Sequence, residues 1–210
     1  MTKERLARFN ALPAEVAQAE LLACCAAPSW ATAVTAGRPY TNLAAILAAT
    51  DDAFARMPSA DLSAAVAAHP RIGDRGTGHS AGPAAPSRDL TGRGEPSSDP
   101  PGPKGHPHSD LSGEGAPDTR NGEWSRQEQA GVASAGADTL AALAVGNRAY
   151  EKRFGRVFLI FATGLTAADL LAALRTRLDN DPDTEEEIVR EELRKITGLR
   201  VRKLLGGDGT

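Results

Sequence analysis

A histidine at position 69 is the first residue whose type and setting could support chemistry. An imidazole with an ordinary pKa near ~6.5 can take up or release a proton at neutral pH. Pro70 follows it, and a residue before a proline is displaced from the α region, so we expect His69 in extended backbone just beyond a helix end. Arg71 adds a nearby positive charge for an anionic substrate. The His-Pro pair alone favours a competing structural role, in which the histidine hydrogen-bonds to the last carbonyls of its own helix.

A second candidate group, formed by Ser125, Glu128 and Gln129, lies further along the chain. The pattern Ser-x-x-Glu is typical of a capping box, in which both side chains bind free amides at a helix start. We therefore predict that a helix begins at Ser125. Such a start presents free N–H groups and the positive end of the helix dipole, which could receive a carboxylate or a urea carbonyl. The Gln129 amide can donate and accept at once, which suits a ureide group.

The third candidate, Arg200, lies on the apolar face of the last predicted helix. It stands one turn after Ile196 and one turn before Leu204. Two interpretations are open: the guanidinium reaches water at the rim of the core, or it is buried because it binds a carboxylate through two hydrogen bonds. The acidic runs 185–187 and 191–192 are predicted to form a solvated face that suits the helix dipole, and we do not count them as site candidates.

No metal or cofactor site is predicted. Cys24 and Cys25 are adjacent in an apolar run, so we expect two buried thiols in a reducing cytosol and no disulfide framework. His79, His106 and His108 lie in a glycine- and proline-rich stretch, where we expect them to be solvated; a metal-binding histidine tract is the alternative. The chain contains no phosphate-binding loop, dinucleotide fingerprint or nucleophile elbow.

The charge balance and hydropathy argue against several classes of partner. The 24 basic and 27 acidic residues give a net charge of −3 and are spread along the chain, which leaves no basic patch for nucleic acid or an anionic membrane. No apolar segment approaches the ~20 residues that span a bilayer, and no signal-peptide pattern follows the N-terminus. We therefore expect a soluble, cytoplasmic protein.

The elements that must position these residues are predicted to be helices. A content of 41% hydrophobic but only 4% aromatic residues favours helices packed through small side chains over a β-sandwich. Apolar residues recur at helical spacing and predict roughly seven or eight helices. The run 157–162 is too short to assign by periodicity, and with no partner strand we expect a buried helix or an extended segment. The fold class is thus an all-α bundle, with residues 1–210 forming a single domain.

One stretch, residues 76–122, differs from everything around it. It contains 10 of the 21 glycines and 8 of the 14 prolines, with Leu90 and Leu111 as its only large aliphatic residues. Because such a segment cannot bury enough apolar area to offset the entropy of ordering, we predict a long disordered surface loop inserted in the domain. The insertion separates His69 from Glu128 in sequence, but lengthening a loop from roughly 5 to 50 residues costs only about 2 kcal/mol of closure entropy.

Taken in order, four segments resemble the family of 2-oxo-4-hydroxy-4-carboxy-5-ureidoimidazoline (OHCU) decarboxylases. Each is ordinary alone, but their order and co-occurrence make the match specific, and they cover nearly all of the chain outside the insertion. The segments are 8–13 with 21–25, 69–73, 124–131, and the region from 147–158 to 195–201. Leu165 and Val201 depart from the common family pattern without removing a catalytic group.

The resemblance implies an all-helical homodimer that releases CO2 from a small ureidoimidazoline substrate and forms (S)-allantoin in urate degradation, with no cofactor. It implies that His69 and Glu128 are catalytic. The residues implied to bind substrate are Pro70, Ser125, Gln129, Phe158, Leu159, Ile160, Phe161, Ala162 and Arg200, with Arg202 as the alternative to Arg200. Arg71 joins them on the separate ground of its charge.

Two rival functions are weighed against this one. A helical relative could use the same pocket to bind a ligand without turnover. A metal-dependent hydrolase could instead combine His69 with the histidines of the insertion. Retention of His69, Ser125, Glu128 and Gln129 together argues against the first rival, and insensitivity of activity to chelators would exclude the second.

Overall fold

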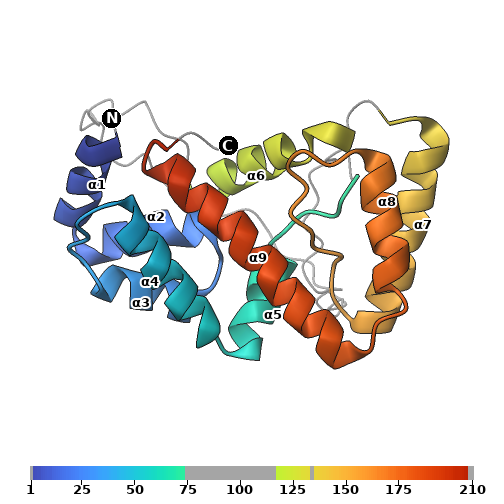
Figure 1. The fold of residues 1–210 in the computed structure, drawn as a ribbon, viewed down its shortest axis with the longest axis horizontal. Helices are drawn as coiled ribbons and strands as arrows, with labels where there is room; N and C mark the ends of the chain where they lie inside the picture. The colour runs from blue at the N-terminus through green and yellow to red at the C-terminus, as the bar shows by residue number, and fades with distance from the viewer. Residues whose placement is uncertain (1, 74–116, 133–134, 208–210) are drawn as a thin grey trace, which may run out of the picture. The chain divides into compact units, whose positions relative to one another are not determined.

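The computed structural model describes residues 2–73, 117–132 and 135–207 (Figure 1). Within these ranges the chain is all-helical, as predicted, with nine α-helices and one 3-10 turn where seven or eight helices were expected. In order they are α1 (Thr2–Ala11), α2 (Ala14–Cys24), α3 (Pro28–Ala36), α4 (Leu43–Ala55), α5 (Ser59–Ala67), α6 (Pro117–Glu128), η1 (Ala130–Val132), α7 (Ala137–Phe154), α8 (Ala167–Arg177) and α9 (Pro182–Leu204). None of the described helices is long and apolar enough to cross a membrane.

Several helix ends follow directly from local residue chemistry. Thr166 and Asp169 form a complete capping box at the start of α8, and the Asp181 side chain accepts from two amides at the start of α9. Pro182 suits the first turn of α9 because its fixed φ is helical and it has no amide to satisfy. The end of α7 falls at Gly155, which adopts the left-handed conformation that glycine tolerates best. Side chains at residues 166 and 181 thus define where these two helices start.

The start of α6 corrects the predicted loop boundary. Most of the predicted loop, residues 76–116, lies outside the described residues, but its last six residues form the first half of α6. Pro117 is compatible with a first helical turn, and α6 packs along α2, where Arg120 pairs with Glu20 at 2.7 Å. Composition concealed this helix because Gly122 and Pro117 indicate a loop, whereas the contacts with α2 stabilise helix.

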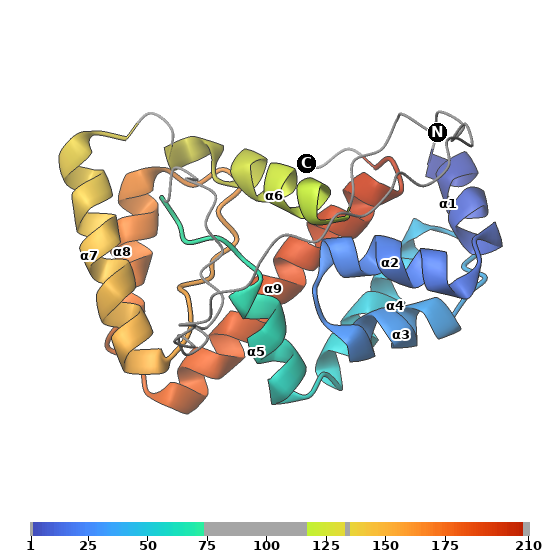
Figure 2. The same cartoon turned by 180° about the vertical axis from the view of Figure 1, so that it is seen from behind.

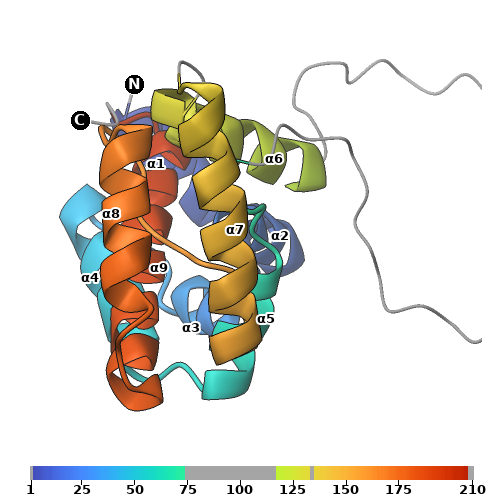
Figure 3. The same ribbon diagram turned by 90° about the vertical axis from the view of Figure 1, so that its right-hand side faces the viewer.

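Two apolar clusters form the core, and α9 contributes buried side chains to the first of them along most of its length. The first cluster joins α1–α5 to α9, and the second lies between α7 and α8, which pack side by side (Figure 3). Figures 1 and 2 show α9 passing between α1–α4 and the α7–α8 pair. With 23 residues, α9 is about 34 Å long, so one helix can carry groups for both sides of the core.

The segment 157–162 separates the two clusters and contains neither helix nor strand. Its side chains alternate, with odd-numbered residues in the first cluster and even-numbered residues in the second. The odd set is Val157, Leu159 and Phe161, and the even set is Phe158, Ile160 and Ala162. A period of two is typical of extended backbone. Of the two predicted alternatives, the structure therefore shows the extended segment.

Candidate active site

His69 lies two residues beyond the end of α5, as the following proline predicts. Its amide donates to the Val66 carbonyl at 3.0 Å, and its Nδ1 lies 2.8 Å from the Ala65 carbonyl oxygen. A carbonyl oxygen only accepts, so Nδ1 carries the proton of the neutral ring and Nε2 presents a lone pair. Nε2 is buried and has no hydrogen-bond partner among the described residues. The hydrogen bond that holds the ring to α5 therefore uses Nδ1 and leaves Nε2 unpartnered.

Burial determines the protonation state of His69. Desolvation, together with the positive charge of Arg200, lowers the pKa of the ring from 6.5 to about 4, and the hydrogen bond to Ala65 opposes part of this shift. The side chain is 8% exposed, which agrees with this cause. At neutral pH the imidazole is therefore uncharged and can accept a proton at Nε2.

Glu128 and Arg200 form a buried ion pair next to His69. The Nε of Arg200 donates to Oε1 of Glu128 at 3.0 Å, and Nη2 donates to Oε2 at 2.7 Å. Arg200 is 1% exposed and Glu128 is 9% exposed. Of the two interpretations of Arg200, burial through two hydrogen bonds to a carboxylate is the one observed, and that carboxylate belongs to the protein.

The guanidinium of Arg200 is fully occupied by protein groups. Besides Glu128, it donates to Oγ of Ser125 at 3.0 Å, to Oδ1 of Asn121 at 2.8 Å and to the Cys24 carbonyl at 3.3 Å. These contacts use all five N–H donors that an arginine possesses. A substrate carboxylate can reach Arg200 only by displacing one of these partners.

The predicted helix start at Ser125 is wrong. Ser125 lies in the last turns of α6, and its carbonyl accepts from the Gln129 amide at 3.1 Å. No free N–H groups are available there, and this end of a helix carries the negative end of the dipole. The Ser-x-x-Glu spacing has a different consequence, because residues three apart in a helix share one face. It directs Ser125 and Glu128 together toward Arg200.

A small cavity lies against this group. The space that water can occupy is about 20 Å³, enough for about one molecule. Its walls combine polar groups with aliphatic ones: His69, Pro70, Ile72, Ser125, Glu128, Gln129, Leu159, Ile160, Ala162 and Ile196. Because this cavity holds only about one water molecule, a larger substrate must widen it.

The structure brings most of the expected site residues to this cavity, but not all of them. Arg71 does not line it and pairs with Glu151 at 2.5 Å, with its side chain 54% exposed. Phe158 packs edge-on against Tyr150, and Phe161 contributes to the first apolar cluster. Arg202 is exposed, so of the two arginines considered, Arg200 is the one beside the cavity.

Two amide side chains hold the loop that follows His69. Gln129 Oε1 accepts from the Gly73 amide at 3.3 Å, and Asn147 Nδ2 donates to the Ile72 carbonyl at 2.9 Å. Asn147 is 4% exposed and was not expected in the site, although it interrupts the apolar stripe of α7 between Leu143 and Tyr150. A polar residue on such a stripe is a signal that it has a buried partner.

Asn121 and Glu185 were also missed. Asn121 lies in the segment predicted as loop, and no local pattern marked it. Glu185 was assigned to a solvated face, but it is completely buried and pairs with Arg177 at 2.5 Å. No group of three or more possible metal ligands occurs in the part of the chain that the structure describes; His79, His106 and His108 lie outside it.

Comparison with known sequences gives consistent matches. The family model for OHCU decarboxylase matches residues 10–96 and 106–202. The uric acid degradation bifunctional protein of Arabidopsis thaliana is 30% identical over 190 residues, which cover 90% of this chain and 48% of that protein. The chain thus spans about half the length of this plant relative. A 2-oxo-4-hydroxy-4-carboxy-5-ureidoimidazoline decarboxylase of Amia calva is 28% identical over 178 residues, 85% of this chain and 81% of that protein.

Solved structures agree with the sequence matches. The crystal structure of an OHCU decarboxylase in the presence of (S)-allantoin superposes with a TM-score of 0.61 and 26% identity, covering 89% of this chain and 97% of that one. A crystal structure of (S)-allantoin synthase shares the fold, with a TM-score of 0.58 at 14% identity over 95% of this chain and 53% of that one. With the family model matched on both sides of residues 97–105 and the His69–Glu128–Arg200 group in place, the chain belongs to the OHCU decarboxylase family.

Proposed function

We propose that this protein is a carbon–carbon lyase that converts OHCU to (S)-allantoin and CO2 by acid–base chemistry without a cofactor. One observation carries the proposal: the uncharged His69 ring has a buried, unpartnered Nε2 and lines a small cavity together with Glu128. The relatives support the choice of substrate, because one is named for decarboxylation of this compound and another was crystallised with (S)-allantoin.

In the first step, Nε2 of His69 accepts the proton of the substrate's 4-hydroxyl group. The bond to the carboxylate breaks, and its electron pair moves toward the neighbouring ring C=N, whose nitrogen takes up negative charge. CO2 leaves as the neutral product. The substrate's own C=N receives the electrons, so the protein's task is to orient the groups and move protons.

In the second step, one proton is delivered to one face of the carbanion-like intermediate, which sets the S configuration, and a second proton, taken from solvent, neutralises the ring nitrogen. His69 is suited to this because an imidazolium whose pKa lies near 4 gives its proton up readily. Glu128, held by two hydrogen bonds from Arg200, has lone pairs left to accept substrate N–H groups or to share in the proton transfer.

Ser125 is the group that connects the substrate carboxylate to Arg200. Its hydroxyl oxygen accepts from Nη2 of Arg200, so its own proton remains free to donate into the cavity. A carboxylate bound there lies near a positive charge without breaking the Arg200–Glu128 pair. This arrangement replaces the free helix amides that the sequence pattern had predicted for carboxylate binding.

The proposal is tested by supplying freshly generated substrate, made from urate with the two upstream enzymes. The circular dichroism of the allantoin formed distinguishes the S product of an enzymatic reaction from the racemate of spontaneous decay. We expect rapid accumulation of (S)-allantoin with CO2 release, unaffected by chelators. A protein that binds the product but does not speed its formation would instead be a non-catalytic relative.

The pH dependence of kcat/KM should reflect the buried state of His69. The free enzyme needs the neutral ring, whose pKa is about 4, so lowering the pH from 8 to 6 should leave kcat/KM level. The acid limb should appear as pH falls toward the folded-state pKa, well below the ordinary value of ~6.5. Initial rates in constant-ionic-strength buffers measure this profile. A limb at 6.5 would contradict either the burial of the base or its identity.

A further inference from the structure

The extended segment 157–162 must be held in place by groups outside itself. It supplies Leu159, Ile160 and Ala162 to the cavity wall but belongs to no helix or sheet. A backbone without regular hydrogen bonds needs other partners for its buried N–H and C=O groups. The side chains that bind these N–H and C=O groups therefore determine the position of this wall of the cavity.

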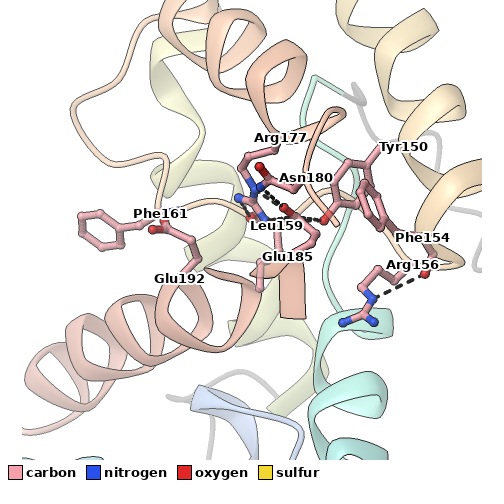
Figure 4. A network of polar contacts seen from close by, with 9 residues as sticks. All are labelled: Tyr150, Phe154, Arg156, Leu159, Phe161, Arg177, Asn180, Glu185 and Glu192. Atoms are coloured by element: carbon pink, nitrogen blue, oxygen red, sulfur yellow. Dashed lines mark hydrogen bonds and ion pairs between the residues drawn. The ribbon is translucent and has the colours of Figure 1, made fainter. Parts of the chain in front are cut away.

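Two long polar side chains bind the segment from one side. Nη1 of Arg177 donates to the Leu159 carbonyl at 2.7 Å, and the Phe161 amide donates to Oε2 of Glu192 at 2.7 Å (Figure 4). In extended backbone, the polar groups of residues two apart face the same edge, and those of the residue between them face the opposite edge. The amides of Ile160 and Ala162 therefore face away from Arg177 and Glu192, and neither donates to a partner among the described residues.

Arg177 is itself locked by a buried network. Its Nε and Nη2 donate to Oε1 of Glu185 at 2.9 and 2.5 Å, while Tyr150 donates its hydroxyl to the same carboxylate and Asn180 donates to Oε2 at 2.8 Å. Burial, with the hydrogen bond to Glu185, raises the pKa of Tyr150, so this hydroxyl stays protonated and donates. Figure 4 shows these side chains converging on Glu185, and the Arg177 guanidinium lies 4.8 Å from the centre of the Phe158 ring.

A buried ion pair of this kind contributes little net stability, because desolvation of two charges offsets most of their attraction. The Arg177–Glu185 pair does, however, fix one N–H donor at the Leu159 carbonyl. Glu192 is only 14% exposed; it also pairs at 2.7 Å with Lys195, whose side chain is 43% exposed. Both contacts therefore hold the backbone at defined points, one residue on either side of Ile160.

We propose that Arg177 and Glu192 are positioning residues for the decarboxylation. They fix the backbone on both sides of Ile160, so that Leu159, Ile160 and Ala162 keep their places in the wall of the cavity that His69 also lines. The expected effect on kcat/KM rests on the proposed function, whereas the expected effect on the order of residues 157–162 does not.

Glu192 gives the sharper test, because it lies near the surface and its loss leaves no buried charge unpaired. Glu192→Ala should lower kcat/KM about tenfold, the size expected for losing a hydrogen bond to a charged group, and should speed hydrogen exchange in the peptide that covers residues 157–162. Glu192→Gln keeps a side-chain oxygen for the Phe161 amide and should recover most of both losses. Lys195→Met removes the ion pair but not the acceptor, and should change neither readout more than twofold.

Each result decides the matter. Unchanged exchange in Glu192→Ala, or faster exchange with wild-type kcat/KM, would overturn the positioning role. Equal losses in Glu192→Ala and Lys195→Met, or no recovery in Glu192→Gln, would assign the effect to charge or stability and would also overturn it. If the wild-type protein does not turn over OHCU, the proposed function fails, while the exchange measurements still report whether Glu192 holds the segment.

Discussion

Replacing His69 with asparagine should lower kcat for (S)-allantoin formation by about 10²–10⁴-fold, the usual contribution of a positioned acid–base group. The asparagine amide nitrogen can take the place of Nδ1 and donate to the Ala65 carbonyl, which His69 now contacts at 2.8 Å. Nothing in the variant replaces Nε2. The substitution therefore removes the proton acceptor and keeps the hydrogen bond that ends α5.

Steady-state rates by circular dichroism and an unfolding curve in urea check this expectation together. The curve should lie close to that of the wild type, since the helix end is preserved. Arg71→Ala is the matched control, because Arg71 is a cation in the same motif whose side chain is exposed and contacts Glu151, outside the cavity. A His69→Asn protein with the wild-type rate, or an Arg71→Ala protein that loses as much, would remove His69 from the mechanism.

Local sequence rules predicted what depends on neighbouring residues alone. The position of His69 beyond α5 follows from Pro70, and the starts of α8 and α9 follow from Thr166 and Asp181. Each of these three features is determined by residues within one helical turn of it. The helical class likewise follows from composition, whereas for residues 157–162 the sequence left a buried helix and an extended segment open.

The start of α6 depends on tertiary contacts and could not be predicted in the same way. The spacing of Ser125 and Glu128 fits both a helix start and one face of a helix interior. Contacts outside that motif decide between them: Arg120 with Glu20, and Asn121 with Arg200. These contacts join residues about a hundred or eighty positions apart, so no local pattern records them.

The buried charges of α9 did leave a signal in the sequence. Glu185 stands one turn before Val189 on the stripe that continues through Leu193 and Ile196 to Arg200. Both charged residues on this stripe are buried, and each forms an ion pair. The dipole argument placed Glu185 with its exposed neighbours, whereas its helical position grouped it with the core. For the burial of Glu185, its position on the apolar stripe matters more than its charge, because packing of the apolar face determines which side of the helix is buried.

Replacing Arg200 with methionine should lower the free energy of unfolding by about 3–5 kcal/mol, the cost of leaving a buried charge without its partner. Glu128 would remain in the core as an unpaired carboxylate, and Ser125, Asn121 and the Cys24 carbonyl would each lose a donor. The same change removes a positive charge that lowers the pKa of His69. The acid limb of any residual activity should therefore shift to higher pH.

A double-mutant cycle separates stability from chemistry at this pair. Glu128→Leu combined with Arg200→Met removes both charges, so much of the lost stability should return, because an apolar pair of similar volume avoids the desolvation cost. Activity should not return, since the carboxylate beside His69 is gone and Ser125 no longer faces a positive charge. Urea unfolding and (S)-allantoin formation are measured on the same four proteins. An active double variant would show that the ion pair serves only the fold, whereas a stable but inactive one assigns to Glu128 and Arg200 a part in decarboxylation that stability does not explain.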